Sequence, residues 1–491
     1  MAEAVVSRPG SNEPPSHHGG LANLDEEHSY WIEEIEGALP ADLEGTFFRN
    51  GPGRQRIGGE KYGHWFDGDG MVCAFTFRDG RAHFRNAYVR TPKYIDETRD
   101  QAIRYRGFGT AIPGGLLANV GRAPANPANT NTMYHAGRLF ALNEGGHPWE
   151  LDPTNLATLG ECDFDGRLEK SEVFSAHGRI HPKTGEYVNF GGGIGGMSLK
   201  GPKPCLNVYR IAPSGELVKK GRVFIDHFPF CHDFVLTEHY AVFFVGSITF
   251  DGIVGVMLGT KCISDVVRYE PAIGMQVLVV DLETLELVKR VETGDGVIVH
   301  FGNAREDGDT IIIDGCYQNS FEANASLLDV FAPESRFNGG VFKRYVVDLK
   351  RGSLTEQVVT DTECEFPTFN NDLVGQRNRV TWTACSVDNG YNGFFNGFQR
   401  LTEDGDARIV TLPPGYYGSE PLFAPAKGAT REDDGYLLEV VYDGFAHRSE
   451  LQIYRADAVT DRVATLKLEH HLPHQFHGHF TREVVAKLPE V

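Results

Sequence analysis

The chain has 491 residues, which is enough for two to four ordinary domains or for one large domain built from repeats. Its net charge of −20 at pH 7 argues against a nucleic-acid partner, because a groove that binds phosphates needs a positive field. The 57 glycines, with 32 phenylalanines and 18 tyrosines against 4 tryptophans, are typical of a mostly β chain.

The spacing of the cysteines indicates the cellular compartment of the protein. They stand singly, without a CxxC pair, at positions 73, 162, 205, 231, 262, 316, 364 and 385. In a chain of this size without a signal-peptide pattern, isolated cysteines predict free thiols in a reducing compartment, so we expect a cytoplasmic protein. No apolar run approaches the roughly 20 residues that span a bilayer, so any membrane contact would be peripheral.

The beginning of the chain differs in composition from the rest. Residues 1–25 are rich in Ser, Pro, Gly and Asn and show no hydrophobic period. This composition predicts a disordered tail over residues 1–25. We expect residues 26–491 to form a single domain.

One pattern recurs through that domain. An apolar, strand-like run meets a short polar turn, and a second β-rich run follows, which is the pattern of a β-hairpin. The turns lie at Asp79, Asp152, Pro213, Asp281, Asp348, Asp404 and Asp457. Seven hairpins at intervals of roughly 50–75 residues predict an all-β fold, a seven-bladed β-propeller whose loop insertions form a cap over a site on the axis. A pair of irregular β-sandwiches is the alternative.

Four histidines follow four of these turns at a similar distance. They are His177, His232, His300 and His477, each roughly 20 residues after a turn, where the inner strand of the next blade should begin. Inner strands line the axis of a propeller, so four imidazoles would point at one centre. A single histidine is more often a surface or core residue than a ligand, and only the shared offset distinguishes these four.

Carboxylates replace histidine after the other turns. Glu365 and Glu420 occupy the corresponding positions after two turns, and Glu144 follows the long insertion after the first. Metal-bound imidazoles need such groups, because a carboxylate accepts the outer ring N–H and offsets the charge of a metal held by neutral ligands. We therefore expect these glutamates behind the histidines.

The identity of the metal stays open at this point. An all-imidazole site suits iron, copper, nickel or zinc. Four nitrogens would complete a tetrahedral, structural zinc site, whereas an octahedral metal would keep two positions for dioxygen or water. The tract from His470 to His479 could also be a local zinc site, although strand alternation would place its rings on both faces. The sequence contains no GxSxG, HExxH or P-loop motif.

Several motifs, in order, resemble those of the carotenoid cleavage oxygenase family, over nearly the whole chain from about Asp25. They are FFRNGPG (47–53), HWFDGDGMV (64–72), ANT (128–130), FSAH (174–177), HDFVLTEHY (232–240), the segment 300–303 and FHGHF (476–480). The resemblance implies a seven-bladed propeller with Fe(2+) on the four histidines and the three glutamates behind them. It also places Thr130 beside a vacant position on the iron.

One departure from the family pattern is visible. Family members often carry paired histidines near the third ligand, where this chain has His300 followed by Phe301. The retained spacing to Asn303 assigns the ligand to His300.

The resemblance further implies that the protein uses O2 to cleave a conjugated C=C bond of a lipophilic alkene, giving two carbonyl products without a side-chain acid or base. Two other functions remain: a propeller scaffold with structural histidines, and an iron-dependent isomerase. An axial ring of four imidazoles is unneeded in a scaffold, so we expect an enzyme. O2 consumption would separate the oxygenase from the isomerase.

The substrate prediction depends on two motifs and two positions. HWFDGDGMV (64–72) and RNGPG (49–53) resemble those of the bacterial apocarotenoid-cleaving members of the family. Stilbene cleavers of the family resemble one another in a lysine just before the glutamate that matches Glu144, and here that residue is Asn143. An uncharged amide stabilises a phenolate less well than an ammonium does. Tyr88 stands where stilbene cleavers also have a tyrosine. We therefore expect an apocarotenoid substrate contacted by Tyr88 and Asn143, with a stilbenoid or another phenylpropanoid alkene as the alternative.

An apolar segment, residues 107–120, is flanked by Arg104, Arg106 and Arg122. A nearly continuous apolar insertion beside basic residues is typical of a membrane-facing entrance for a lipophilic substrate. Packing of this segment beneath the propeller as core is the alternative.

Overall fold

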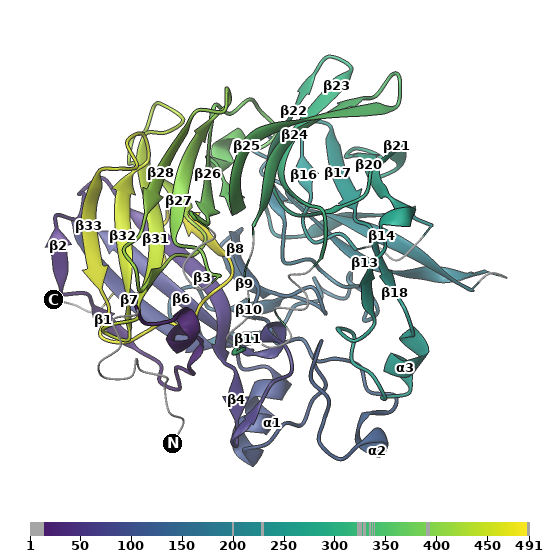
Figure 1. Ribbon diagram of the computed structural model, residues 1–491, viewed down its shortest axis with the longest axis horizontal. Coiled ribbons are helices and arrows are strands. Elements are labelled where there is room, and N and C mark those ends of the chain that lie inside the picture. Colours follow the sequence, from purple (N-terminus) through teal and green to yellow (C-terminus); the bar gives the residue numbers. More distant parts are fainter. Residues whose placement is uncertain are drawn as a thin grey trace.

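The computed structural model describes residues 14–198, 201–226, 230–321, 327, 330–332, 335, 337, 339–388 and 393–488. Regular structure in these residues is almost all antiparallel β-sheet, and the sheets fan around a common centre (Figure 1). The few helices are short.

The first blade joins the two ends of the chain. Its strands are, in order, β1 (Ser29–Trp31), β7 (Arg81–Tyr88), β6 (Asp69–Arg78), β3 (Gly45–Arg54) and β34 (Gly478–Thr481). The last of these comes from the far end of the sequence and places Phe480 opposite Phe47 of β3. This pairing closes the ring of blades.

The next three blades have four strands each. The second contains β8 (Asn131–His135), β9 (Arg138–Leu142), β10 (Trp149–Leu151) and β11 (Thr158–Glu161). The third contains β12 (Arg179–Ile180), β13 (Tyr187–Ser198), β14 (Gly201–Ile211) and β15 (Leu217–Phe224). The fourth contains β16 (Val235–Leu236), β17 (Tyr240–Val245), β20 (Met275–Asp281) and β21 (Leu287–Thr293).

One continuous sheet provides the fifth and sixth blades. Its strands are β22 (Val297–Asp307), β23 (Thr310–Gln318), β24 (Gly340–Asp348), β25 (Ser353–Thr368), β26 (Val380–Cys385), β27 (Gly397–Thr402) and β28 (Ala407–Thr411). The long β25 is shared, because its first part pairs with β24 and its last part with β26.

The seventh blade is built from the last part of the chain and one early strand. It contains β30 (Leu422–Pro425), β31 (Gly435–Asp443), β32 (Arg448–Arg455), β33 (Arg462–Lys467) and β2 (Ile35–Gly37), with β29 (Tyr416–Tyr417) also pairing along β31. Over the described residues the sheets therefore form seven blades, and the predicted seven-bladed propeller is confirmed.

The predicted hairpin turns lie where the sequence placed them. Asp79 falls between β6 and β7, and the other six turns likewise connect the last two strands that the chain adds to a blade before moving to the next. Asp79 and Gly80 both have positive φ, 53° and 69°, which is the conformation of the tight turn that Asp-Gly favours.

The core lies between the blades, and for this reason the central strands are apolar on both faces. In β17, alternate residues point to opposite sides. Phe243 packs against Phe190 of the third blade, with ring centroids 5.2 Å apart, and Phe244 packs against Tyr345 of the fifth, at 5.3 Å. Stacked interfaces of this kind hold the blades in a fixed arrangement around the centre.

The predicted disordered tail is wrong for residues 14–25, and residues 1–13 lie outside the described part of the chain. The 3-10 helix η1 (His17–Leu21) begins after Ser16, whose side-chain oxygen accepts from the His18 N–H. His17 and Leu21 are buried, and the His474 backbone N–H donates to Gly20 O at 2.7 Å. Because these partners come from the other end of the chain, local composition does not reveal them.

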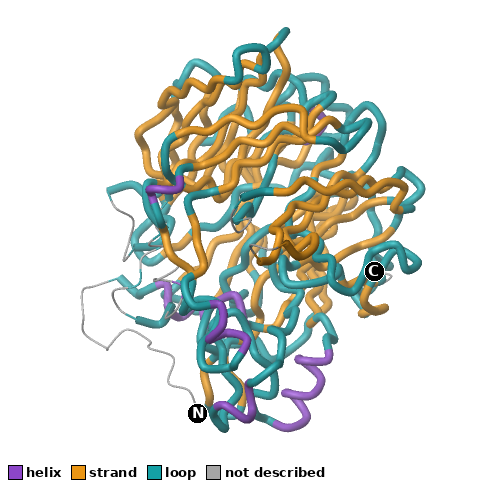
Figure 2. The backbone as a smooth tube through the Cα atoms, turned by 90° about the vertical axis from the view of Figure 1, so that its right-hand side faces the viewer, coloured by secondary structure: helices purple, strands orange, loops and turns teal. Residues whose placement is uncertain are grey.

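Insertions between strands gather on one side of the propeller (Figures 1 and 2). They carry α1 (Pro92–Asp100), α2 (Leu116–Asn119), α3 (Ile253–Met257), and the small sheets of β4 (Arg56–Ile57) with β5 (Glu60–Lys61) and β18 (Ile248–Phe250) with β19 (Val267–Tyr269). The remaining 3-10 helices are η2 (Trp65–Asp67), η3 (Pro271–Ile273) and η4 (Asn371–Leu373). None of the described helices has the length and apolar character needed to cross a bilayer.

Candidate metal centre

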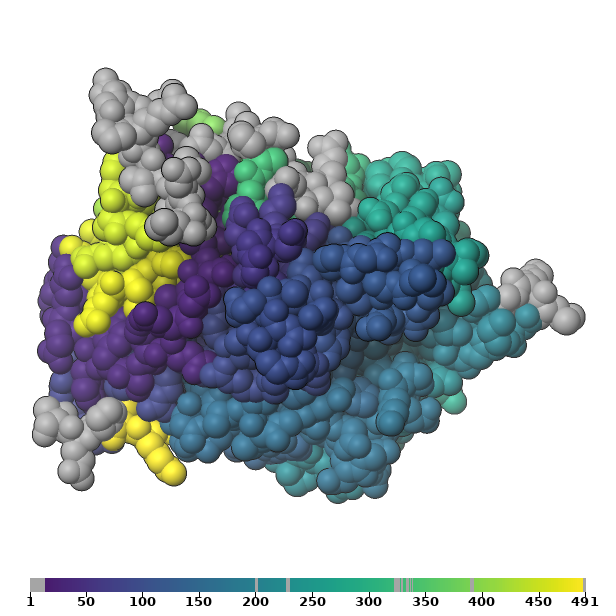
Figure 3. Space-filling model, turned by 90° about the horizontal axis from the view of Figure 1, so that it is seen from below, coloured from purple at the N-terminus to yellow at the C-terminus, as the bar shows by residue number. Residues whose placement is uncertain are grey.

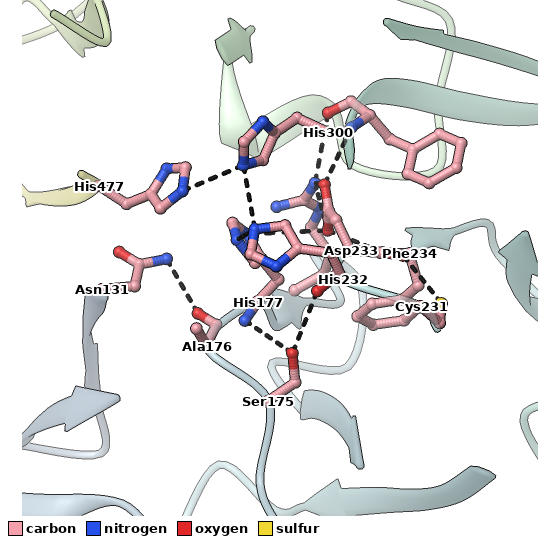
Figure 4. Close-up of polar contacts among 12 residues, drawn as sticks. Asn131, Ser175, Ala176, His177, Cys231, His232, Asp233, Phe234, His300 and His477 are labelled. Atoms are coloured by element: carbon pink, nitrogen blue, oxygen red, sulfur yellow. Dashed lines mark hydrogen bonds and ion pairs between the residues drawn. The ribbon is translucent and has the colours of Figure 1, made fainter. Parts of the chain in front are cut away.

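Four histidine side chains from different blades point at one another (Figure 4). The Nε2 atoms of His177 and His232 are 3.0 Å apart, those of His232 and His300 are 3.2 Å apart, and those of His300 and His477 are 3.1 Å apart. One ring nitrogen from each lies within 4.8 Å of the others. The structure thus brings together the four histidines that the spacing singled out.

The blades explain why these residues meet. His177 and His232 lie just before β12 and β16, His300 lies in β22, and His477 directly precedes β34. Each of these is the strand at which the chain enters, or in the case of β34 closes, a blade. Equivalent positions in equivalent blades converge on the axis, and this is the physical basis of the constant offset from the turns.

The other three blades present different residues at the same place. Thr130 directly precedes β8, Glu365 lies in the part of β25 that pairs with β26, and Glu420 lies just before β30. The two predicted carboxylate substitutions are therefore at positions equivalent to the histidines. Glu144 is the exception, because it follows β9 within the second blade.

The arrangement of ring nitrogens suits a metal ion. At metal–nitrogen distances of about 2.1 Å, adjacent corners of an octahedron are about 3.0 Å apart and those of a tetrahedron about 3.4 Å. Two of the observed separations, 3.0 and 3.1 Å, are closer to the octahedral value, and the third, 3.2 Å, lies midway between the two values. Unprotonated nitrogens this close repel one another unless a cation lies between them. The site therefore fits a six-coordinate metal that keeps two positions free of imidazole.

Three carboxylates hold the outer nitrogens of three rings. His300 Nδ1 donates to Glu365 Oε2 at 2.6 Å, and His477 Nδ1 donates to Glu420 Oε1 at 2.9 Å. His232 Nδ1 pairs with Glu144 Oε1. These bonds place the proton on Nδ1 and turn the Nε2 lone pair toward the centre, and three negative charges balance a metal dication held by neutral ligands.

Burial governs the protonation of the site. It lowers the pKa of His177 and of His477 well below the usual range, so both imidazoles are neutral, which is the form that binds a metal. Burial also acts to lower the pKa of His232, but the carboxylates of Glu144, Asp233 and Glu365 together outweigh it, and the pKa is raised. The pKa of Glu420 is raised to about 7 by burial, against the opposing charge of Arg49. A bound dication would favour the ionised form of that carboxyl.

Thr130 and Asn143 lie together beside the histidines. The Thr130 carbonyl accepts from the His477 backbone N–H at 3.2 Å, so this residue contacts a ligand segment directly. Asn143 Nδ2 donates to Thr130 Oγ1 at 3.2 Å and to Asn129 Oδ1 at 3.1 Å. Asn143 is thus in contact with the residue predicted to adjoin the open metal position.

Tyr88 does not have the surroundings expected of a substrate contact. Its ring is buried in the core of the first blade and stacks on Tyr94 at 4.7 Å, and its hydroxyl donates to Leu24 O at 2.8 Å. The Leu24 carbonyl belongs to the N-terminal segment whose composition predicts disorder. We therefore correct the prediction for Tyr88, whose contacts are those of a core residue.

Two residues at the site, Asp233 and Phe366, were not predicted from the sequence. Asp233, the residue after His232, is buried with its Oδ1 3.9 Å from His177 Nδ1, beyond hydrogen-bond length. Phe366, the residue after Glu365, has φ +54° and places its ring 4.9 Å from that of His300 and 5.3 Å from that of His477. Their positions next to candidate site residues in the sequence were the available signal.

Comparisons with known proteins identify the family of the chain. The family model described as retinal pigment epithelial membrane protein matches residues 21–482. Apocarotenoid-15,15'-oxygenase of Synechocystis sp. is 35% identical over 472 residues, with 94% of each chain covered. Lignostilbene-alpha,beta-dioxygenase isozyme III of Sphingomonas paucimobilis is 29% identical, with 93% of this chain and 94% of that protein covered.

A crystal structure of cobalt-substituted Synechocystis ACO is similar to this structure with a TM-score of 0.88 at 34% identity, covering 96% of this chain and 99% of that one. The similarity therefore extends over the whole propeller and its insertions. Because the family model and these relatives each match nearly the full length of the chain, the protein belongs to the carotenoid cleavage oxygenase family, the family of the retinal pigment epithelial membrane protein.

Proposed function

We propose that His177, His232, His300 and His477 bind Fe(2+) and that the protein cleaves a conjugated C=C bond of an apocarotenoid with O2. One alkene and one O2 give two carbonyl products, so the atoms balance without a further reductant. The observation that carries the proposal is the convergence of four imidazoles, whose Nε2 atoms lie 3.0, 3.2 and 3.1 Å apart from one histidine to the next, backed by three carboxylates. The similarity to apocarotenoid-15,15'-oxygenase supports the choice of substrate.

Bound iron(II) would supply the electrons that make O2 reactive. The protein would hold the site rigid and keep water from it. Phe366 lies against two of the histidines, and its ring joins Phe395 at 5.6 Å in an aromatic cluster that also includes Trp65 and Phe476. Such a wall suits an apolar polyene, and no acid or base is needed at the bond that breaks.

The experiment is incubation of the Fe(II)-loaded protein with a β-apocarotenal in air-saturated buffer. We expect two carbonyl products by chromatography and mass spectrometry, and uptake of one O2 for each substrate consumed. Geometric isomers formed without O2 uptake would show that the protein is an isomerase and not an oxygenase. Cleavage of stilbenes alone would favour the lignostilbene type of substrate, which the similarity to the Sphingomonas dioxygenase keeps as the second candidate.

We also propose that the segment 107–120 contacts a membrane. Leu116, Leu117 and Val120 are exposed, with Leu117 88% exposed, whereas Arg106 is buried and bridges to the segment of α3 by donating to Val256 O. The backbone of Gly121 donates to Met257 O at 3.3 Å, so α2 and α3 are neighbours on this face of the molecule (Figure 3). Exposed apolar residues on both helices extend the predicted surface.

The doubly substituted protein Leu117→Glu/Met257→Glu should lose most of its flotation with phosphatidylcholine liposomes, because two carboxylates oppose burial in the lipid interface. Met257 is itself 69% exposed, so neither change should disturb the fold. Leu159→Glu is the control for an added surface carboxylate, since Leu159 is exposed on β11, a strand of the second blade that belongs to neither helix. Equal flotation of all three proteins would count against membrane contact at this surface.

A further inference from the structure

Asp233 makes contacts that tie together three of the histidine-bearing segments. Its carboxylate is 2% exposed. Asp233 Oδ1 accepts the Phe234 backbone N–H at 2.7 Å, and Oδ2 accepts the Phe301 backbone N–H at 3.0 Å. Arg179 Nη2 donates to Oδ2 at 2.9 Å and to Oδ1 at 3.2 Å.

Asp233 and two of its partners, Arg179 and Phe301, each follow a different histidine in the sequence. Arg179 follows His177 closely on the third blade, Asp233 itself follows His232 on the fourth, and Phe301 follows His300 on the fifth. One carboxylate thus links segments of three separate sheets, next to the site itself (Figure 4). Hydrogen bonds to a buried charged group are the stronger kind, so these contacts define positions closely.

The backbone beside His300 is irregular. The pairing of β22 with β23 shifts register on both sides of Phe301, so the regular ladder is interrupted next to His300. His177 also lacks the carboxylate bond that the other three rings have, and the nearest negative charge to its Nδ1 is Asp233 at 3.9 Å. Asp233 therefore supports one ligand segment whose strand pairing is interrupted and one ring that no glutamate holds.

We propose that Asp233, paired with Arg179, is a positioning residue for the metal centre, which fixes the relative positions of His177, His232 and His300 and thereby sets metal affinity and coordination geometry. The inference rests on the metal centre of the proposed function but does not depend on the substrate. In Asp233→Asn, one oxygen becomes an NH2 group that faces backbone N–H or guanidinium donors, so at least one of the links is lost.

The test is a titration of metal-free protein with Co2+, read by visible absorption, comparing wild type with Asp233→Asn and a matched control. Asp314→Asn provides the control, because Asp314 is a buried aspartate that accepts two 2.8 Å bonds from Arg344 on the neighbouring β24. We expect Asp233→Asn to weaken Co2+ binding roughly 10–100-fold and to change the absorption bands, as loss of a group behind the ligands does. Asp314→Asn should match wild type in both readouts.

Wild-type Co2+ affinity and bands in Asp233→Asn would overturn the proposal. If that variant does not fold, Arg179→Gln carries the test, because it keeps both backbone bonds to Asp233 and should still weaken Co2+ binding; wild-type affinity there would overturn it equally. Weaker Co2+ binding in Asp233→Asn, together with an Fe(II)-loaded wild type that does not cleave an apocarotenal, would support the role of Asp233 and reject the proposed substrate. A wild-type protein that binds no Co2+ would reject both.

Discussion

His300→Ala should lose its metal and its cleavage activity together. His300 is central in the ring, since its Nε2 atom lies 3.2 Å from that of His232 and 3.1 Å from that of His477. Its removal takes away one of four ligands and leaves the Glu365 carboxylate without the imidazole that it holds. We expect no bound iron by elemental analysis after desalting, and turnover of a β-apocarotenal below detection.

The control for this loss is His239→Ala, which removes an exposed histidine paired with Glu306 elsewhere on the propeller. It should keep full iron content and turnover. Glu365→Gln provides a graded comparison, because glutamine keeps an acceptor for His300 Nδ1 but not the charge, and we expect roughly 10–100-fold weaker activity or iron retention. Full iron and turnover in His300→Ala would remove that residue from the ligand set.

The fold was predictable because its repeat is local. Each blade ends in a hairpin, and a few adjacent residues determine its turn. Asp79 and Gly80, which both have positive φ values, are an example. For six of the seven turns the spacing to the next entering strand is similar, and residues at that spacing meet on the axis. The first turn is the exception, because a long insertion separates Asp79 from β8. Thr130 came only from the family resemblance, yet its place before β8 is equivalent to that of the histidines.

The errors concern contacts between distant parts of the chain. The segment 14–25 looked disordered by composition, but it docks on residues near the opposite end, through bonds such as that from the His474 backbone to Gly20. Tyr88 looked like a substrate contact, but its hydroxyl is bonded to Leu24 of the same docked segment. Asp233 likewise gains its importance from Arg179 and Phe301, and neither partner is near it in sequence. Periodicity carries no information about such partners.

We expect the protein to prefer a β-apocarotenal to resveratrol, with kcat/KM at least about 10-fold higher, which corresponds to a missing hydrogen bond between a charged group and the phenol. Asn143 is the reason. Its Nδ2 is committed to Asn129 and Thr130, and its Oδ1 accepts the Gly145 backbone N–H at 2.8 Å. The Asn143 amide is therefore already hydrogen-bonded beside Thr130, and it carries no positive charge that could stabilise a phenolate.

The measurement compares kcat/KM for both substrates in wild type, Asn143→Lys and Asn143→Met. Lysine supplies the ammonium and should narrow the preference for the apocarotenal by raising activity on resveratrol. Methionine removes the same amide bonds to Asn129 and Thr130 without adding charge, so it separates the effect of the ammonium from the disturbance of Thr130. A wild-type protein that prefers resveratrol would show the substrate choice to be wrong, and because the histidines converge independently of Asn143, the fold and the metal centre would stand.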